Sequence, residues 1–232
     1  MLAAISRSRF WDIATRAVGA VCLMLFGAAA FSAIEVTVRL IEAGGSAARL
    51  VPTLVVNVCI FTLLLIEVTL IVSRSRPVAK APGVKPRLSA LVGTWLIYLV
   101  VLLPVRVDLP APMYYVSAVL ATLGDLASIY AVMHLGRSYS LMAEALQPIA
   151  GGPYAIVRHP LYLAEQIALL GALITYLSWR ALALFAAQSF FQYLRARNEE
   201  RVLARTFPAY AAYMLRTPML LPHLLVRRGP VR

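Results

Sequence analysis

The chain has 232 residues, of which 61% are hydrophobic and only 14% are charged, and its formal net charge is +12. Soluble domains carry about a quarter of charged residues, so this composition excludes an ordinary soluble protein and indicates an integral membrane protein. Because the basic residues lie between and after long apolar runs, membrane topology explains the positive charge better than nucleic-acid binding does.

Successive apolar runs are each long enough to cross the roughly 30 Å hydrocarbon core of a bilayer as an α-helix. The last two are separated only by Ser178 and Trp179, which predicts a tight helical hairpin. The first has no convincing small-residue cleavage site, so we expect a retained helix rather than a signal peptide. The sequence therefore predicts an all-α, polytopic membrane protein with about six transmembrane helices, at about 14–36, 50–72, 88–105, 113–135, 161–177 and 180–196.

The distribution of Lys and Arg predicts the orientation. If both termini are cytoplasmic, 18 of the 22 basic residues fall on the cytoplasmic side, which is the usual topological signal. The basic, proline-rich segment 73–87 is then expected as a loop at the anionic inner-leaflet surface. We expect a bacterial inner-membrane protein with both termini cytoplasmic and four basic residues outside: Arg39, Arg49, Arg106 and Arg180.

The chain divides into two parts. We expect residues 1–87 to hold two transmembrane helices and the basic linker, in front of a second membrane domain at 88–232. This second part contains four transmembrane helices and a cytoplasmic C-terminal helix. Glu67 and Asp125 lie at membrane depth, where ionisable residues usually face a bundle interior. We interpret both as structural, bonded to each other through a shared proton or to backbone.

Metal chemistry is not expected. The three histidines, His134, His159 and His223, lack the spacing of metal ligands. Cys22 and Cys59 lie inside apolar runs and are interpreted as small buried hydrophobes. The chain also has no glycine-rich nucleotide loop and no nucleophile elbow, so any cofactor must bind among helix ends and loops.

The segment GGPYAIVRHPLYLAE (151–165) places polar residues just before a helix. The glycines and proline at 151–153 cannot continue a helix and predict a tight turn whose N–H groups can approach a ligand. Pro160 suits a first helical turn, so Arg158 and His159 precede a helix N-terminus, where a carboxylate is favoured. The alternative is topological, with Arg158 as a surface anchor and His159 as a helix cap.

The C-terminal segment contains two further groups of polar residues. Glu199 and Glu200 follow the last apolar run, where the simplest interpretation is a solvated, salt-bridged helical face. Tyr210, Tyr213 and Arg216 share a helical face, and Arg216 could hold an anionic group through two parallel hydrogen bonds. The alternative for the second group is an interfacial tyrosine belt with a snorkelling arginine.

Taken in order, three segments resemble the isoprenylcysteine carboxyl methyltransferase family and its wider relatives, which include phospholipid N-methyltransferases. The segments are LGRSYS (135–140), the 151–165 segment and RARNEERVLARTFPAYAAYMLRTPMLLP (195–222). The resemblance covers roughly the last hundred residues. Ala164 and Met219 depart from the family pattern, which usually has Gly and often a second Arg there. The Arg-His-Pro-x-Tyr pattern also occurs in membrane sterol reductases that use NADPH.

The resemblance implies an S-adenosylmethionine pocket on the cytoplasmic side, closed by the C-terminal helix, with a lateral opening for a lipid-like substrate. A carboxylate near the cofactor's ammonium or sulfonium is physically sensible, and the resemblance points to the glutamate pair for cofactor binding. The implied cofactor-binding residues are Gly152, Pro153, Tyr154, Arg158, His159, Tyr162, Glu199, Glu200 and Tyr213. The implied catalytic residues are Arg216, Glu200 and His159.

The sequence therefore predicts an S-adenosylmethionine-dependent methyltransferase acting on a membrane lipid or lipid-like acceptor, with carboxyl O-methylation of an isoprenoid or acyl compound favoured. The alternatives are methylation of a phospholipid amine or a small thiol, an NADPH-dependent reductase of an isoprenoid or sterol-like double bond, and a non-enzymatic membrane protein with the same scaffold. No nucleic-acid or metal partner is expected. We also expect Arg158 and Glu200 to lie at the membrane surface. Replacing either by alanine should therefore lower the free energy of unfolding by no more than about 0.5 kcal/mol.

Overall fold

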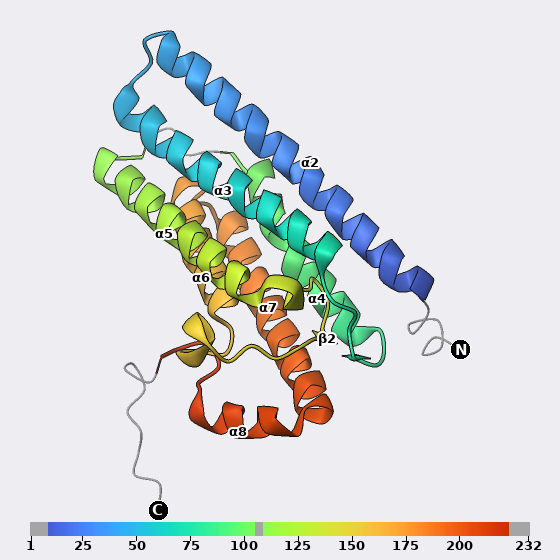
Figure 1. Ribbon diagram of the computed structural model, residues 1–232. Helices are drawn as coiled ribbons and strands as arrows, with labels where there is room; N and C mark the ends of the chain where they lie inside the picture. Colours follow the sequence, from blue (N-terminus) through green and yellow to red (C-terminus); the bar gives the residue numbers. More distant parts are fainter. Residues whose placement is uncertain (1–8, 105–108, 223–232) are drawn as a thin grey trace, which may run out of the picture.

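The structure, a computed structural model, describes residues 9–104 and 109–222 (Figure 1). It is almost entirely helical in these residues, which confirms the predicted all-α class. The long helices are α2 (Arg9–Glu42), α3 (Ala47–Ser73), α5 (Ala111–Leu135) and α7 (Trp179–Thr206). The shorter elements are β1 (Ala79–Lys80), α4 (Lys85–Trp95), η1 (Leu96–Leu102), η2 (Gly136–Ser138), β2 (Glu144–Ala145), η3 (Gly152–Ala155), α6 (Pro160–Thr175) and α8 (Pro208–Arg216).

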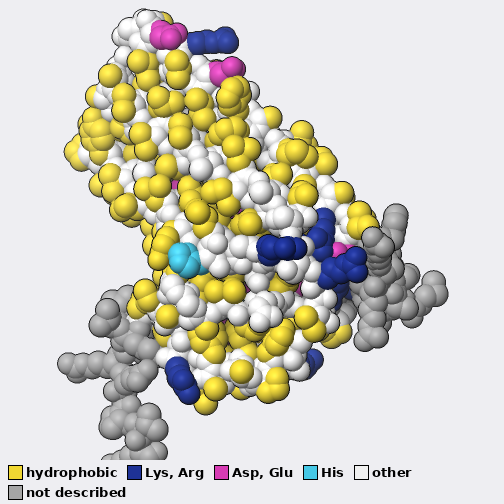
Figure 2. Space-filling view, in the orientation of Figure 1, with side chains coloured by type: hydrophobic (Ala, Val, Ile, Leu, Met, Phe, Trp, Pro, Cys, Tyr) yellow, Lys and Arg dark blue, Asp and Glu magenta, His cyan; other side chains and the backbone are white. Residues whose placement is uncertain are grey.

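Helices occupy all six stretches predicted to cross the membrane. Three of them are long and apolar enough to do so, at Asp12–Glu42, Ala47–Ser73 and Ala111–Ser138, and α6 is a shorter apolar helix. Apolar side chains cover the long face formed by α2, α3 and α5, whereas basic side chains gather near its lower end (Figure 2). These features confirm a helical membrane protein, and the count of six crossings stays a prediction.

The third predicted helix differs from the expectation. It is an α-helix only to Trp95 and continues as the 3-10 helix η1 to Leu102. Leu103 is extended (φ −86°, ψ 149°) because the following Pro104 disfavours the helical conformation of the residue before it. The end predicted at residue 105 lies outside the described residues, as do Arg7, Arg106 and the arginines beyond position 222.

Small residues let the central helices touch backbone to backbone. A Cβ atom added to Gly124 on α5 would lie 2.3 Å from the backbone nitrogen of Ala168 on α6. One added to Gly171 on α6 would lie 2.5 Å from the backbone nitrogen of Ala121. In membranes, where helices gain little from apolar burial against lipid, such close approach is a main source of association. This contact fixes α6, whose N-terminal end carries the polar site described below.

The linker predicted as a surface loop is partly built into the fold. Its strand β1 pairs antiparallel with β2, with Ala79 opposite Ala145 and Lys80 opposite Glu144. Arg74, at the start of this linker, is buried and does not lie in an open surface loop. The linker therefore ties the first two helices to the segment that follows α5.

Glu67 and Asp125, the two acidic residues expected at membrane depth, are both buried. The structure does not pair Glu67 with Asp125. Glu67 lies within hydrogen-bonding reach of Tyr139, and Oδ2 of Asp125 has no partner among the described residues. The suggested shared proton between these acids is therefore not supported.

Candidate functional site

A small pocket lies where α6 begins, α7 ends and α8 crosses below them (Figure 1). Its volume is about 40 Å³. The segment between η2 and η3 forms one wall, and the ends of α7 and α8 form the other. The lining residues are Leu135, Ser138, Glu144, Leu146, Gln147, Pro148, Ile149, Tyr154, Arg158, His159, Glu199, Leu203, Tyr210 and Tyr213.

The predicted turn at 151–153 forms and leads into η3. Gly152 adopts φ +58°, a conformation that side-chain-bearing residues rarely adopt. A Cβ atom on Gly152 would also lie 2.4 Å from Cδ2 of His134. Pro160 begins α6, as predicted. The turn buries Tyr154, whose backbone carbonyl accepts a 2.5 Å hydrogen bond from the Tyr213 hydroxyl.

Gly152→Ala is expected to destabilise the protein by about 1–2 kcal/mol, because an L-residue is strained at this φ and its methyl group would displace His134. Gly151→Ala is the matched control, since Gly151 has φ −99° and its added Cβ would meet nothing within 4 Å. Thermal melting in detergent measures both. Equal melting temperatures for the two variants would contradict the assigned turn.

Arg158 holds the C-terminal segment against the rest of the site. Its Nε donates to Oε1 of Glu200 at 2.7 Å, and its Nη1 donates at 2.8 Å to the carbonyls of Met214 and Thr217. Its backbone N–H donates to the carbonyl of Pro218 at 2.8 Å. The guanidinium therefore joins α7 to the end of α8. These contacts do not fit the alternative in which Arg158 only anchors the chain at the membrane surface.

Glu200 is the second buried member of this cluster. It is 4% exposed, and Oε1 also lies 3.1 Å from Nε2 of His159. Burial raises the pKa of Glu200, but hydrogen bonds and charge from His159 and Arg158 outweigh it and leave the pKa lowered. The carboxylate is therefore ionised at neutral pH. The interpretation of Glu200 as part of a solvated helical face is therefore wrong, and its burial removes the reason to expect that its loss costs little stability.

The hydrogen bond to Glu200 fixes the tautomer of His159. An ionised carboxylate only accepts hydrogen bonds, so Nε2 of His159 carries a proton and donates it to Glu200. His159 occupies the N-cap position of α6, but its side chain makes no capping hydrogen bond. The cap alternative is therefore not supported, and the ring lines the pocket instead.

Glu199 points to a different partner from its neighbour. It is half-buried and accepts a 2.8 Å hydrogen bond from the Tyr162 hydroxyl. The Tyr162 ring stacks on the His159 ring, with ring centroids 5.1 Å apart. Cζ of Arg195 lies over the Tyr162 ring, 4.9 Å from its centroid. Tyr162, which His159 and Arg195 hold in place, thus positions the side chain of Glu199 at the pocket wall.

The tyrosines of α8 reach the pocket, but Arg216 does not. Tyr210 is buried and Tyr213 half-buried, and both line the pocket. Burial raises the pKa of Tyr213 to about 12, so its phenol stays neutral and donates to Tyr154. Arg216 ends α8, is exposed and is not part of the pocket wall. Its predicted catalytic role therefore has no support from the geometry.

Sequence reasoning missed the wall formed by residues 144–149. Glu144 is buried there, and its carboxylate contacts Arg74, Lys80 at 3.1 Å and Ser140 at 3.0 Å. A single acid within the otherwise apolar stretch LMAEAL was the available signal. Among the described residues, no group of three or more His, Cys, Asp and Glu side chains could hold a metal ion.

Together, the fold and the pocket define a helical membrane protein with a small, partly polar pocket at the ends of its helices. Residues 112–210 match the phospholipid methyltransferase family. The resemblance to membrane methyltransferases predicted for the last third of the chain is thereby confirmed. The matched segment runs from α5 to α8 and contains most of the pocket wall.

Two curated proteins resemble the same half of the chain. The cobalt-zinc-cadmium resistance protein CzcN of Cupriavidus metallidurans is 33% identical over 120 residues, which are 50% of this chain and 55% of that protein. The nickel-cobalt-cadmium resistance protein NccN of Alcaligenes xylosoxydans xylosoxydans is 29% identical over 121 residues, with the same coverage of 50% and 55%. The chain thus matches about half the length of these relatives.

Proposed function

We propose that the protein is an S-adenosylmethionine-dependent methyltransferase that acts on an amphiphilic acceptor at the membrane surface. The observation that carries this proposal is the convergence of one family segment on one pocket. Residues of the turn at 151–160, Glu199 near the end of α7 and the tyrosines of α8 line this pocket, and all of them except Tyr213 lie within residues 112–210. Methyltransferases of this family use S-adenosylmethionine.

The chemistry of the pocket fits this cofactor. S-adenosylmethionine carries an ammonium, a sulfonium and a carboxylate. Glu199 offers a carboxylate whose recorded hydrogen bond within the described residues comes from Tyr162, so it can take a cationic group. Arg158 uses Nε and Nη1 for internal bonds, which leaves Nη2 for a carboxylate. Tyrosine rings and leucines supply flat and apolar surface for an adenosine group.

The pocket is narrower than the cofactor requires. Its volume of about 40 Å³ is far below the roughly 300–1,000 Å³ of typical small-molecule sites, so binding must widen it. The bonds of Arg158 to Met214 and Thr217 and the bond from Tyr213 to Tyr154 hold α8 over the pocket. We therefore propose that α8 and its following segment move outward to admit the cofactor.

The bound cofactor would supply an electrophilic methyl group: an acceptor lone pair forms a bond to the methyl carbon while the carbon–sulfur bond breaks and its electron pair stays on sulfur. The chain's own contribution is then alignment and exclusion of water. Nδ1 of His159 can accept the proton of a neutral amine, hydroxyl or thiol acceptor, and Glu200 orients the ring through Nε2. A carboxylate acceptor, which we favour, needs no base.

Purified protein in detergent is expected to bind S-adenosylmethionine or S-adenosylhomocysteine with micromolar affinity, about −8 kcal/mol. NADPH should not compete. Titration calorimetry and thermal protection measure this, and stronger protection by NADPH would favour the reductase instead. Binding of neither would favour a non-enzymatic scaffold. Methyl transfer is then compared on a prenylated cysteine analogue, a phospholipid amine and a short thiol, and turnover of the thiol alone would contradict a lipid acceptor.

We also propose the orientation with both termini cytoplasmic, which rests on the excess of basic residues on one side. A cysteine at Gly83, in the linker, should react with a membrane-impermeant maleimide only from the cytoplasmic side. A cysteine at Gly44, between α2 and α3, should react only from the opposite side. The native Cys22 and Cys59 are replaced by alanine in both proteins. Labelling of both sites from one side would contradict this topology.

A further inference from the structure

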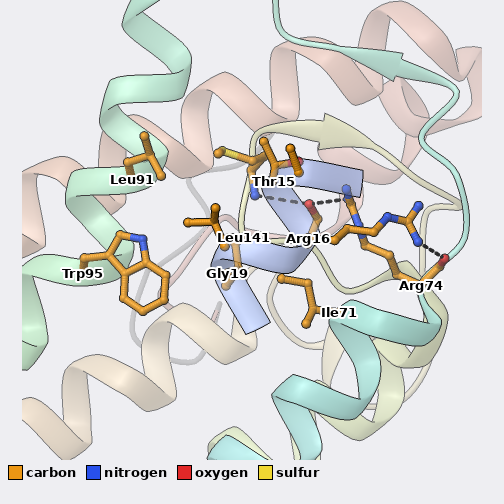
Figure 3. A pocket seen from close by; sticks show the side chains of 12 residues that line it. Thr15, Arg16, Gly19, Ile71, Arg74, Leu91, Trp95 and Leu141 are labelled. Carbon is orange, nitrogen blue, oxygen red and sulfur yellow. Dashed lines mark hydrogen bonds between the residues drawn. The ribbon is translucent and has the colours of Figure 1, made fainter. Parts of the chain in front are cut away.

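A second cavity lies outside the segment that matches the family. It is enclosed by α2, α3, α4 and residues 140–142, and its volume is about 230 Å³. Arg16 and Arg74 lie together at one end, and the Trp95 ring and Leu91 lie at the other, with Leu141 between them (Figure 3). The cavity is therefore amphipathic, with cationic groups at one end and an apolar wall.

This cavity is separate from the proposed cofactor pocket. Ser140, Leu141 and Met142 line it, whereas Ser138 and Glu144, in the same short segment, line the other pocket. No lining residue is shared between the two. The cavity is contributed mainly by the first two helices and α4, for which the methyltransferase segment provides no role.

The charges at the end of the cavity that holds Arg16 and Arg74 are not balanced. Arg16 and Arg74 both pair with Asp12, at 2.8 Å and 2.7 Å, and Arg74 also contacts Glu144. Lys80 adds a third cation, 3.1 Å from Glu144. Three cations against two carboxylates leave one positive charge in this cluster. An anion bound beside these arginines would neutralise this charge.

The arginines also retain unused donors. Nε of Arg16 and Nε of Arg74 are both buried, and neither has a partner among the described residues. The Arg74 side chain is only 3% exposed. A buried guanidinium N–H without an acceptor costs free energy, and a phosphate or carboxylate oxygen would remove this cost through a charge-assisted hydrogen bond.

The position of the cavity in the membrane indicates which kind of anion it can bind. Arg74 directly follows the last residue of α3, and Arg16 lies near the start of α2, so both are at the depth of lipid head groups. Val18 and Leu91 line the cavity and are 64% and 40% exposed. The mouth is thus apolar and faces the side covered by exposed hydrophobic residues. Basic pockets between transmembrane helices are typical binding sites for anionic lipid head groups.

We propose that this cavity binds an anionic membrane phospholipid, with its phosphate on Arg16 and Arg74 and the upper part of an acyl chain against Leu91 and Trp95. The remaining chain leaves past Val18 into the bilayer. A free phosphate ion has the same head-group chemistry, but it gains nothing from the apolar wall. The chain anchors the lipid in the bilayer beside the cavity, so its phosphate reaches the arginines at a high effective concentration that a free phosphate ion lacks. This site is independent of the proposed methyl transfer.

The test uses the full chain, delipidated in neutral detergent. Phosphatidylglycerol is expected to raise the melting temperature and to bind about tenfold tighter than phosphatidylcholine, because the ammonium group of phosphatidylcholine cancels the charge of its phosphate and repels the basic cluster. Inorganic phosphate at the same concentration should have no effect. An equal response to the two lipids would overturn the head-group assignment, and protection by inorganic phosphate equal to that by phosphatidylglycerol would overturn the lipid assignment.

Two variants with matched controls locate the site. Ala14→Leu fills the cavity and leaves both arginines in place, whereas Ala17→Leu adds the same bulk at an exposed position of α2 that does not line it. Arg16→Gln removes one cation, and Arg39→Gln removes an exposed one near the other end of α2. Ala14→Leu and Arg16→Gln should lose the preference for phosphatidylglycerol, and the controls should keep it.

S-adenosylmethionine binding is measured on the same samples and should be unchanged in Ala14→Leu, so failure of the lipid site and failure of the methyltransferase proposal are distinguishable. If Arg16→Gln does not fold, Ala14→Leu decides alone. A folded Ala14→Leu protein that still prefers phosphatidylglycerol as the wild type does would overturn the proposal.

Discussion

Glu200→Ala is expected to destabilise the protein by about 3–5 kcal/mol, because it leaves the largely buried guanidinium of Arg158 without its carboxylate. The same change removes the partner of His159 Nε2. The measurement is thermal or denaturant unfolding in detergent. A surface glutamate would cost only about 0.5 kcal/mol, so the two interpretations differ severalfold.

Arg201→Ala provides the control for this prediction. Arg201 is on the same helix, is exposed, and its recorded hydrogen bond is to Asn198 at 3.2 Å. The Arg201→Ala substitution should change the free energy of unfolding by no more than about 0.5 kcal/mol. A Glu200→Ala protein that melts like Arg201→Ala would show that the Arg158–Glu200 pair does not hold the C-terminal segment.

The same cluster predicts a dependence on pH. The folded protein lowers the pKa of Glu200 below its ordinary value of 4.5, so its contribution to stability is complete above about pH 4.5. That contribution is lost as the pH falls through the lowered value. The difference in melting temperature between the wild type and Glu200→Gln should therefore be constant near neutral pH and shrink in acid.

The helices could be predicted from sequence because their signal is local. A continuous apolar run of the length of a bilayer specifies a helix whatever it packs against. The helices α3 and α5 begin and end within three residues of expectation, whereas α2 begins five residues earlier and ends six residues later than expected. The turn at Gly152 and the start of α6 at Pro160 were also predictable, since glycine and proline restrict the backbone themselves.

The roles of the charged residues were harder to predict because they depend on contacts distant in sequence. Glu199 and Glu200 are neighbours, but they point about 100° apart on α7, and only the return of the chain after α8 decides which is buried. Arg74 and Glu144 are 70 positions apart and meet only because β1 pairs with β2. A pattern of basic residues predicts topology and cannot distinguish a buried arginine from a surface one.

The largest expected effect on ligand binding is at Glu199, and it rests on the proposed function. Glu199 accepts a hydrogen bond from Tyr162 and lines the proposed cofactor pocket. Glutamine keeps an acceptor oxygen for the Tyr162 hydroxyl but removes the negative charge. A hydrogen bond to a charged group contributes about 1.5–3 kcal/mol, so Glu199→Gln should weaken S-adenosylmethionine binding by about 10- to 150-fold.

The stability of this variant separates a binding role from a structural one. Because Glu199 is only half-buried and the Tyr162 bond can persist, the melting temperature without ligand should change little. Glu35→Gln, which removes an exposed carboxylate on α2, controls for the change in net charge. Calorimetric titration of the wild type and both variants measures the affinities. If Glu199→Gln binds the cofactor as tightly as Glu35→Gln does, the carboxylate of Glu199 does not contact the cofactor's cationic groups, and the assignment of this pocket wall is wrong.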